Sequence, residues 1–362
     1  MRIAFFGQDG SFNLSNIGGT NSLVRRIAPG IIQKGHQVDA VYYDSDEYRE
    51  SNENSIREVF FEEFRSATNH LSDYDHVIVL YVDKSRIPQF MYTCMTTNST
   101  EFHYYYLEYP ENTFERLGNL GSKVLTPYGG SSLCISKRLQ RRVSQFRSRT
   151  HLCHPPVPES YFQEKNDALE KPINILFLGR LDDGKGIFES IELIEKLEGY
   201  DNFNSKVIGT YWEEDKIARE THEYLNSSTI DYTHIDFESY TPRVDELVRT
   251  ELEHADVFLQ PYRKISSSID TPLLILEAMA AGCVIFSRPL GGLPSIYGNS
   301  ETLITGDHTQ FVDEAFEKMI NYDSWFATEK KRVLNQVEEL NIKTEQKVEE
   351  LIDILEESSE HA

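Results

Sequence analysis

The chain has 362 residues, of which 39% are hydrophobic and 26% charged, and its formal net charge is −23. This length predicts two globular domains, and we find no apolar run near the roughly 18 residues that a membrane span needs. The strong negative charge repels phosphate backbones, which argues against nucleic acid as a partner.

The first half of the chain alternates short apolar strands with amphipathic helices. Strands are expected at 2–7, 36–43, 76–82 and 101–109, and helices at 21–35 and 55–71. Alternation of this kind predicts a parallel sheet. Because the chain enters its first strand directly, without the longer apolar region of a signal peptide, we expect a cytosolic protein.

A long polar loop follows the first expected strand and ends at Gly18 and Gly19, before a helix. Glycines at this place let a ligand approach the backbone, although they can also simply make a turn. The spacing is not that of a dinucleotide-binding G-x-G-x-x-G loop, and the helix begins too late. An oxidoreductase is therefore not favoured.

His103 lies inside the aromatic strand expected at 101–109. A histidine in such a strand is either packed and hydrogen-bonded or functional, and the sequence alone leaves both interpretations open.

The segment 136–149 concentrates positive charge in this acidic chain. Leu139 and Val143 lie on one face of an expected helix, and the basic residues are Lys137, Arg138, Arg141, Arg142, Arg147 and Arg149. Such a helix can contact anionic lipid or a phosphorylated acceptor, or it can be a solvated helix that balances nearby carboxylates.

The second half repeats the alternation. Strands are expected at 173–179, 205–209, 230–237, 256–260 and 283–287, and a long charged helix at 323–357. The segment 154–172, rich in proline and charge, predicts a domain boundary near residue 160. We therefore expect an α/β protein with two doubly wound, Rossmann-like parallel-sheet domains that face a cleft, with ligands at the carboxyl ends of the strands.

Two cations follow the strand expected at 173–179. Arg180 comes directly after it, and Lys185 lies between Gly184 and Gly186 at the start of a helix. Helix amides and two cations suit a phosphate group. The alternative is that both cations are surface residues paired with Asp182 and Asp183.

A single carboxylate, Glu277, interrupts the apolar helix in "SSSIDTPLLILEAMAAG" (266–282). Thr271 is expected to cap this helix and Pro272 to be its first residue. A buried carboxylate is costly unless it is paired or hydrogen-bonded. The partner of Glu277 is therefore either another protein group or a ligand rich in hydrogen-bond donors.

These motifs, in this order, resemble the family 4 retaining glycosyltransferases with the GT-B fold. The resemblance rests on "GGTNSLV", "KGHQVDAVYY", "FLGRLDDGKG", "HADVFLQP" and above all "PLLILEAMAAGCVIFSRPLGG". It implies an N-terminal acceptor domain, 1–160, completed by the helix 323–357, and a C-terminal nucleotide-sugar donor domain, 161–322.

The resemblance also implies roles for individual residues. Arg180 and Lys185 would hold the donor diphosphate, Gly18 and Gly19 would lie near the diphosphate and sugar, and Glu277 would bind the ribose. The start of the same helix, Leu273 and Leu274, would contact the nucleotide, and His103 would face the sugar near the acceptor. No metal is expected, because the two cations supply the charge that a metal would otherwise provide.

The chain departs from the family pattern at several positions. Ile269 stands where the family has the first glutamate of a pair, Pro272 replaces a glycine, and Ser295 stands where an acid is common. Asp270, directly after Ile269, is the candidate to replace the missing carboxylate.

The sequence thus predicts a retaining glycosyltransferase that moves a hexose-like sugar from a nucleoside diphosphate donor to an acceptor hydroxyl, for glycan or glycoconjugate synthesis. The expected acceptor is a glycan or a lipid-linked molecule, and the protein is expected to be either free in the cytosol or peripherally bound to the inner face of the membrane. The alternatives are a nucleotide-sugar epimerase of the same fold and a catalytically weak partner subunit, to which Ile269 lends weight.

Overall fold

The structure, a computed structural model, forms two compact units, Met1–Pro156 with Ile342–Ala362 and Val157–Asn341. It describes residues 1–51, 56–97, 99–107, 130–145, 147–162, 171–212, 214–235, 240–265 and 268–359. The N-terminal segment of the first unit ends at Pro156, close to the boundary expected near residue 160. Part of the segment that suggested this boundary, 163–170, lies outside the described residues.

The first unit is built on an eight-stranded sheet with the order β3-β4-β2-β1-β5-β6-β7-β8. Its strands are parallel to their neighbours except for the antiparallel pair β3 and β4. They are β1 (Arg2–Gln8), β2 (Gln37–Tyr43), β3 (Arg49–Ser51), β4 (Arg57–Phe60), β5 (His76–Val79), β6 (Glu101–Tyr106), β7 (Ser132–Cys134) and β8 (Thr150–Leu152).

The helix expected at 55–71 is wrong in its first part, where the chain forms the strand β4 instead. The residues of β4 contain Val59 and Phe60, which are buried in the sheet, and β-branched and aromatic residues suit strands. Only the remainder, Phe64–His70, is helical. The short strands β3, β7 and β8 were not expected.

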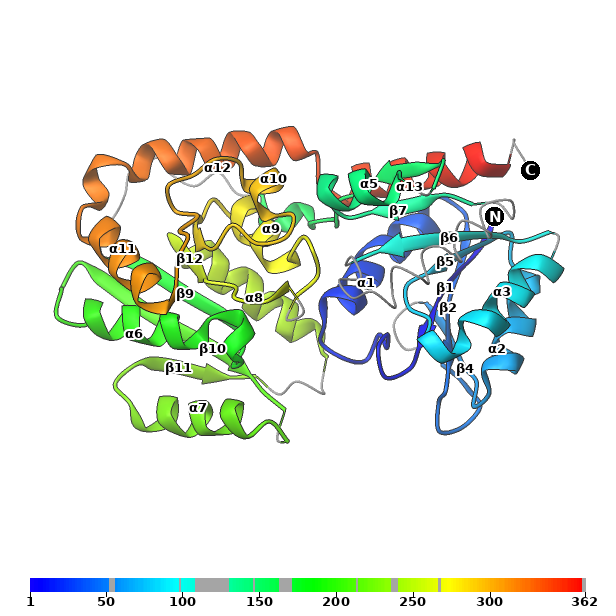
Figure 1. Ribbon diagram of the computed structural model, residues 1–362, viewed down its shortest axis with the longest axis horizontal. Coiled ribbons are helices and arrows are strands. Elements are labelled where there is room, and N and C mark those ends of the chain that lie inside the picture. The colour runs from blue at the N-terminus through cyan, green and yellow to red at the C-terminus, as the bar shows by residue number, and fades with distance from the viewer. Residues whose placement is uncertain are drawn as a thin grey trace. The chain divides into compact units, whose positions relative to one another are not determined.

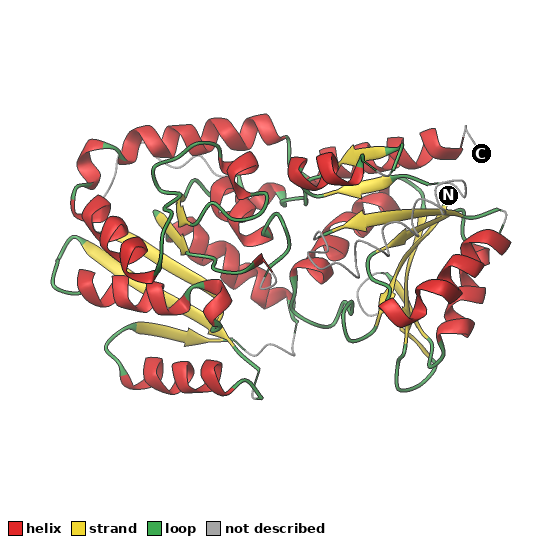
Figure 2. Cartoon of the chain, in the orientation of Figure 1, coloured by secondary structure: helices red, strands yellow, loops and turns green. Residues whose placement is uncertain are grey.

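Helices flank this sheet, as Figure 2 shows by secondary structure. They are α1 (Gly19–Gln33), α2 (Phe64–His70), α3 (Ile87–Thr96), α5 (Lys137–Val143) and the C-terminal α13 (Thr344–Ser359). α13 packs against α1, although the two helices lie at opposite ends of the sequence (Figure 1). Gly30 permits the contact, because a Cβ there would lie 2.6 Å from the Val348 Cγ2.

The second unit has a fully parallel five-stranded sheet with the order β11-β10-β9-β12-β13. Its strands are β9 (Ile173–Arg180), β10 (Phe203–Thr210), β11 (Asp231–His234), β12 (Val257–Gln260) and β13 (Val284–Ser287). The strand order reverses between β9 and β12, which is where ligands bind in doubly wound sheets. Each of the five strands corresponds to one predicted from the sequence.

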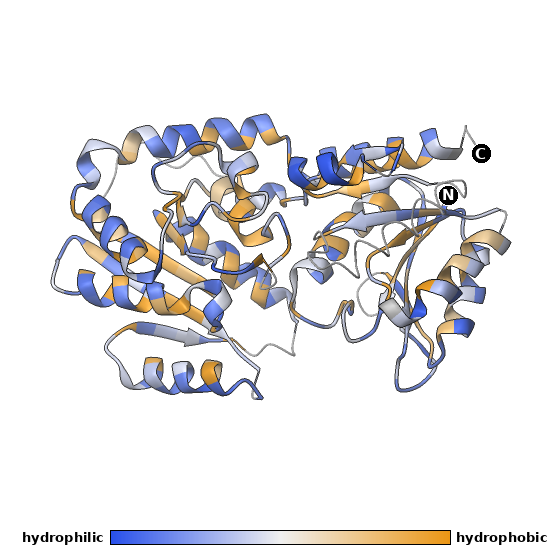
Figure 3. Ribbon diagram, viewed as in Figure 1, coloured by the Kyte–Doolittle hydropathy of each residue, from blue (hydrophilic) through white to orange (hydrophobic). Residues whose placement is uncertain are grey.

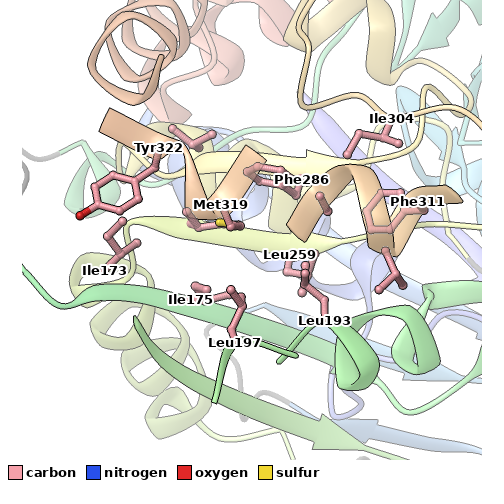
Figure 4. Packing of buried hydrophobic residues seen from close by; sticks show 14 of the residues in the cluster. Ile173, Ile175, Leu193, Leu197, Leu259, Phe286, Ile304, Phe311, Met319 and Tyr322 are labelled. Carbon is pink, nitrogen blue, oxygen red and sulfur yellow. The ribbon is translucent and has the colours of Figure 1, made fainter. Parts of the chain in front are cut away.

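Helices of the second unit bury apolar side chains on this sheet. They are α6 (Ile187–Leu197), α7 (Lys216–Ser227), α8 (Pro242–His254), α9 (Leu273–Ala280), α10 (Leu293–Tyr297), α11 (His308–Ile320) and α12 (Phe326–Leu340). In Figure 4, Leu193 of α6 lies near Leu259 of β12 and Leu197 near Ile175 of β9, and Phe311 and Met319 of α11 belong to the same cluster. Figure 3 shows β9 as largely hydrophobic, whereas the edge strand β11 is more hydrophilic.

The single helix expected at 323–357 is wrong, because the chain breaks between α12 and α13. Asn341 adopts a left-handed conformation with φ of 50° and ends α12, as asparagine often does at helix ends. α12 packs on α9, α10 and β13 and so belongs to the second unit. Only α13 lies in the first unit.

Candidate anion-binding site at the switch point of the second sheet

The candidate site lies at the carboxyl ends of β9 and β12, where the strand order of the second sheet reverses. The loop after β9 carries Arg180 and Lys185, and the loop after β12 runs from Pro261 toward α9. Main-chain hydrogen bonds join the two loops, because the N–H groups of Arg263 and Lys264 donate to the Gly184 oxygen at 2.9 and 3.4 Å.

Arg180 is the last residue of β9. Its Nε lies 3.1 Å from the Asp182 carboxylate, and its guanidinium carbon is 4.7 Å from the centre of the Trp212 ring. A cation over an indole face is favourable. The expected alternative, pairing of Arg180 with Asp182, is therefore present, and the guanidinium also contacts the Trp212 ring.

Lys185 ends the short 3-10 turn Asp183–Lys185, whose first turn is capped by Asp182 through a 3.0 Å bond from the Lys185 N–H. Its Nζ lies 4.7 Å from the centre of the Tyr262 ring and 3.5 Å from the Tyr262 hydroxyl. Burial, and then the positive charge of Arg180, lower the pKa of Lys185 to about 7, against the opposing effect of Asp182. An anion would favour the charged form.

Asp183 pairs with Arg263 and, at 3.3 Å, with Lys264. Gly186 then starts α6 with φ of 77°, and a Cβ there would lie 2.3 Å from the Pro261 oxygen, so only glycine fits. The turn, α6 and the loop after β12 are therefore closely packed around Lys185.

α9 follows the loop after β12 and holds Glu277, whose exposed fraction is 1%. Leu273 is buried and Leu274 partly exposed. The expected helix start is off by one residue: Pro272, with ψ of 126°, is at the cap position in place of Thr271, and the helix begins at Leu273.

Asp270, with an exposed fraction of 2%, lies against the loop that follows β13. The Gly292 N–H donates to its main-chain oxygen at 2.9 Å. A Cβ on Gly291 would lie 3.3 Å from the Asp270 Oδ1. The structure thus brings the segment before α9 and the loop after β13 together.

In the first unit, Gly18 caps α1 without a side-chain hydrogen bond. The preceding loop is held by two side chains of α1. The Asn21 Oδ1 accepts from the Asn13 N–H at 3.1 Å, and Arg25 donates to the oxygens of Leu14 and Asn16 at 2.7 and 2.9 Å. Gly18 and Gly19 remain partly or fully exposed at the carboxyl side of β1.

His103 is wholly buried in β6, and both ring nitrogens are engaged. The Ser131 N–H donates to Nδ1 at 3.0 Å, and Nε2 lies 3.1 Å from the His76 Nδ1. Burial, reinforced by His76, lowers the pKa of His103 to about 3. This placement does not support the expected role beside a sugar.

His76, Glu101 and His103 form a compact cluster at the amino-terminal ends of β5 and β6, and the three pairs of ligand atoms are 3.1, 3.7 and 3.7 Å apart. These dimensions would suit a divalent cation bound at about 2 Å. However, the Ser131 N–H requires a lone pair on the His103 Nδ1, so the proton lies on Nε2, which then donates to His76. A metal-bound histidine normally donates, rather than accepts, through its second nitrogen. The residues therefore fit a shared proton better than a metal.

The basic segment places Lys137 and Arg141 on the exposed side of α5 with Arg138 and Arg142 partly exposed beside them, while Leu139 and Val143 are buried. Figure 3 shows α5 as hydrophilic. Arg147 differs, because it is buried 4.8 Å from the Tyr104 ring centre. Within the described part of the chain, no helix is long and apolar enough to cross a membrane.

Sequence reasoning missed the aromatic rings Tyr262 and Trp212 and a buried charge cluster around Glu189. The exposed fraction of Glu189 is 0%, and Arg288, Arg263 and His308 approach its carboxylate. The sequence held little signal for this cluster, because α6 also carries Glu192 and Glu195 and nothing local marks Glu189 as the buried carboxylate.

Residues 160–332 match the protein family described as glycosyl transferases group 1. We found no match among curated protein sequences.

Solved structures with the same fold cover almost the whole chain. HepE of Anabaena, in complex with UDP-glucose, has a TM-score of 0.70 and 12% identity over 98% of this chain and 99% of its own. A glycosyltransferase from Rickettsia africae has a TM-score of 0.72 and 12% identity over 100% and 99%. The catalytic domain of starch synthase IV from Arabidopsis thaliana, bound to ADP and acarbose, has a TM-score of 0.66 and 10% identity over 99% of each chain.

Proposed function

We propose that this chain, whose residues 160–332 belong to the glycosyl transferases group 1 family and whose fold is GT-B, is a retaining glycosyltransferase that uses a nucleoside diphosphate sugar. The observation that carries the donor assignment is the pair of cations, Arg180 and Lys185, held over aromatic rings at the switch point of the second sheet. The similar fold of HepE with UDP-glucose makes UDP-sugars the first donors to test.

In this proposal the two cations stabilise the departing diphosphate. The bond between the anomeric carbon and the diphosphate oxygen breaks, and its electron pair leaves with the diphosphate. The acceptor oxygen forms the new bond on the same face of the sugar, and its proton passes to the leaving diphosphate. Preorganised cations that meet developing charge are an effective way to lower such a barrier.

The two carboxylates near α9 take different parts. Glu277 accepts hydrogen bonds from both hydroxyl groups of the ribose, which suits a buried carboxylate. Asp270 contacts hydroxyls of the transferred sugar in place of the carboxylate that Ile269 lacks. Leu273, Leu274, Gly18 and Gly19 contact the donor through apolar surface and main chain. His103 is assigned a structural part, because its nitrogens are already engaged.

A nucleotide-sugar epimerase would bind the same donor but act without an acceptor, and a partner subunit would bind without turnover.

A hexose as the transferred sugar and synthesis of a glycan or glycoconjugate remain part of the proposal. The charge of the two cations makes a metal unnecessary for holding the diphosphate in this scheme.

The acceptor is a glycan or lipid-linked molecule, and α5 docks the enzyme on anionic lipid. Lys137, Arg138, Arg141 and Arg142 lie within one and a half turns and share one side of the helix, opposite the buried Leu139 and Val143. Such an arrangement suits an anionic surface.

The deciding experiment is a donor panel. The protein is mixed with UDP-, ADP- and GDP-sugars, and binding is followed by calorimetry while the sugar product is followed by NMR. We expect one donor to bind and to be slowly hydrolysed or transferred with retention at the anomeric carbon. An epimerised nucleotide sugar would favour the epimerase, and tight binding without any conversion would favour the partner subunit.

A further inference from the structure

We propose that Glu189 is a positioning residue for Lys185, acting through Arg263 and Asp183. This inference rests on the proposed donor site, but it concerns a side chain that would not touch the donor. Glu189 lies in the first turn of α6, four residues after Lys185.

The carboxylate of Glu189 joins three separate loops. Its Oε1 lies 2.9 Å from Nη2 of Arg288, which follows β13, and 3.5 Å from Nε of Arg263, which follows β12. His308, the first residue of α11, places Nδ1 3.7 Å from the same oxygen. One buried carboxylate therefore lies beside two arginines and a histidine from three separate parts of the chain.

Arg263 carries this restraint to the turn that holds Lys185. Its guanidinium pairs with Asp183, and its main-chain N–H donates to the Gly184 oxygen at 2.9 Å. Asp183 and Gly184 are the two residues before Lys185. A displacement of Arg263 would thus move the lysine directly.

Arg288 fixes the same loops from the other side. It donates to the oxygens of Pro261, Gly306 and Asp307 at 2.8, 3.4 and 3.2 Å. Pro261 also contacts Gly186, the residue after Lys185. Burying a carboxylate costs desolvation free energy that apolar packing would avoid. Because Glu189 nevertheless contacts several loops, we infer that it fixes the positions of these loops relative to one another.

The direction in which UDP affinity changes in Glu189→Gln distinguishes a positioning role of Glu189 from a purely electrostatic one. If Glu189 acted only through its charge, Glu189→Gln would strengthen anion binding and lower the pKa of Lys185 further, because a negative charge is lost. If Glu189 positions the turn, the variant should bind UDP about tenfold more weakly, ~1.4 kcal/mol. The pKa of Lys185 should then rise toward its ordinary value, since the amino group is less confined against Tyr262.

The experiment measures both quantities. UDP affinity is determined by calorimetry, and the pKa of Lys185 in the ligand-free protein by NMR of isotopically labelled lysine, with Lys185→Arg to identify the signal. Glu195→Gln is the matched control, because it removes an equal charge from the same helix at an exposed side chain whose partner is Tyr224, outside this cluster. We expect this control to behave as wild type.

Asp183→Asn gives a second test if Glu189→Gln does not fold. It removes a partly exposed negative charge from the Arg263 pair and should also weaken UDP binding and raise the pKa of Lys185. Stronger binding, or a lower melting temperature with affinity and pKa unchanged, would overturn the proposal. Failure of the wild type to bind any nucleoside diphosphate would instead refute the donor site, and the ligand-free titration would still decide the part of Glu189.

Discussion

The Nζ of Lys185 lies 4.7 Å from the centre of the Tyr262 ring, at the point where the second sheet reverses its strand order. Burial and the charge of Arg180 keep the pKa of this amino group near 7, so its charge changes within the physiological range. A bound diphosphate would raise the pKa of Lys185 and so favour its protonated form.

Donor binding should therefore take up a proton above pH 7. In the free protein Lys185 is largely neutral at pH 8 to 9, and a diphosphate raises its pKa, so affinity falls as pH rises, by up to about tenfold per unit. Calorimetry of UDP binding at pH 8.5 in buffers of different ionisation enthalpy measures the proton. Lys185→Arg, which stays charged, should show neither the uptake nor the pH dependence. Identical behaviour of the two proteins would contradict the assignment.

Replacing either cation should weaken donor binding while the fold remains. Arg180→Ala and Lys185→Ala each remove a charged contact to phosphate, for which about 1.5 to 3 kcal/mol is typical, or roughly 10- to 150-fold in affinity. Lys216→Ala is the control, because this exposed lysine of the same unit pairs with Glu220, away from the turn that holds Lys185. If all three variants bind UDP equally, the two cations do not hold the diphosphate.

Substitutions of Glu277 and Asp270 should affect different parts of the donor. Glu277→Gln should weaken binding of sugar-free UDP, because Glu277 is proposed to hold the ribose. Asp270→Asn should leave UDP affinity unchanged and lower turnover, because a sugar contact acts in the transition state. Melting temperatures of both variants identify any loss caused by the fold alone. Equal losses of UDP affinity would show that this division of roles is mistaken.

Acid should destabilise the first unit through His76 and His103. Burial lowers the pKa of His76 to about 4 and that of His103 to about 3, whereas an unfolded histidine titrates near 6.5. The unfolded chain binds protons first, so stability is complete above about pH 6.5 and falls as pH decreases, by about 1.4 kcal/mol per unit for each histidine. Urea unfolding between pH 7.5 and 5 measures the slope, which should be smaller in His103→Gln. An unchanged slope would argue against the buried neutral pair.

Membrane docking through α5 predicts binding to anionic vesicles at low salt that weakens as salt increases. The double variant Lys137→Glu with Arg141→Glu should abolish this binding without changing UDP affinity. Lys196→Glu with Lys216→Glu makes the same change of charge in the second unit and should have little effect. Failure of the wild type to sediment with vesicles rich in phosphatidylglycerol would rule the docking out.

Several features of this protein could be predicted from the sequence, because they depend on local chemistry. The apolar strands of the second unit, the glycines around Lys185 and the lone carboxylate in α9 were readable because periodicity, backbone freedom and the cost of burying a charge act over a few residues. The break at Asn341 and the strand at Arg57–Phe60 were not predicted. Charged or apolar runs are compatible with both helices and strands, and tertiary packing decides which element forms.

Only the tertiary structure decided which side chains meet. Tyr262 lies 77 residues from Lys185 in sequence, and Arg288 lies 99 residues from Glu189. Both pairs nevertheless meet, because the parallel strands β9, β12 and β13 all end at the same edge of the sheet. The same holds for His103. The register of β5 and β6 pairs His76 with Glu101, the side-chain contact with His76 occupies one ring nitrogen of His103, and the Ser131 N–H occupies the other. A histidine reads alike in sequence whether it faces a ligand or a core, because long-range packing sets its surroundings.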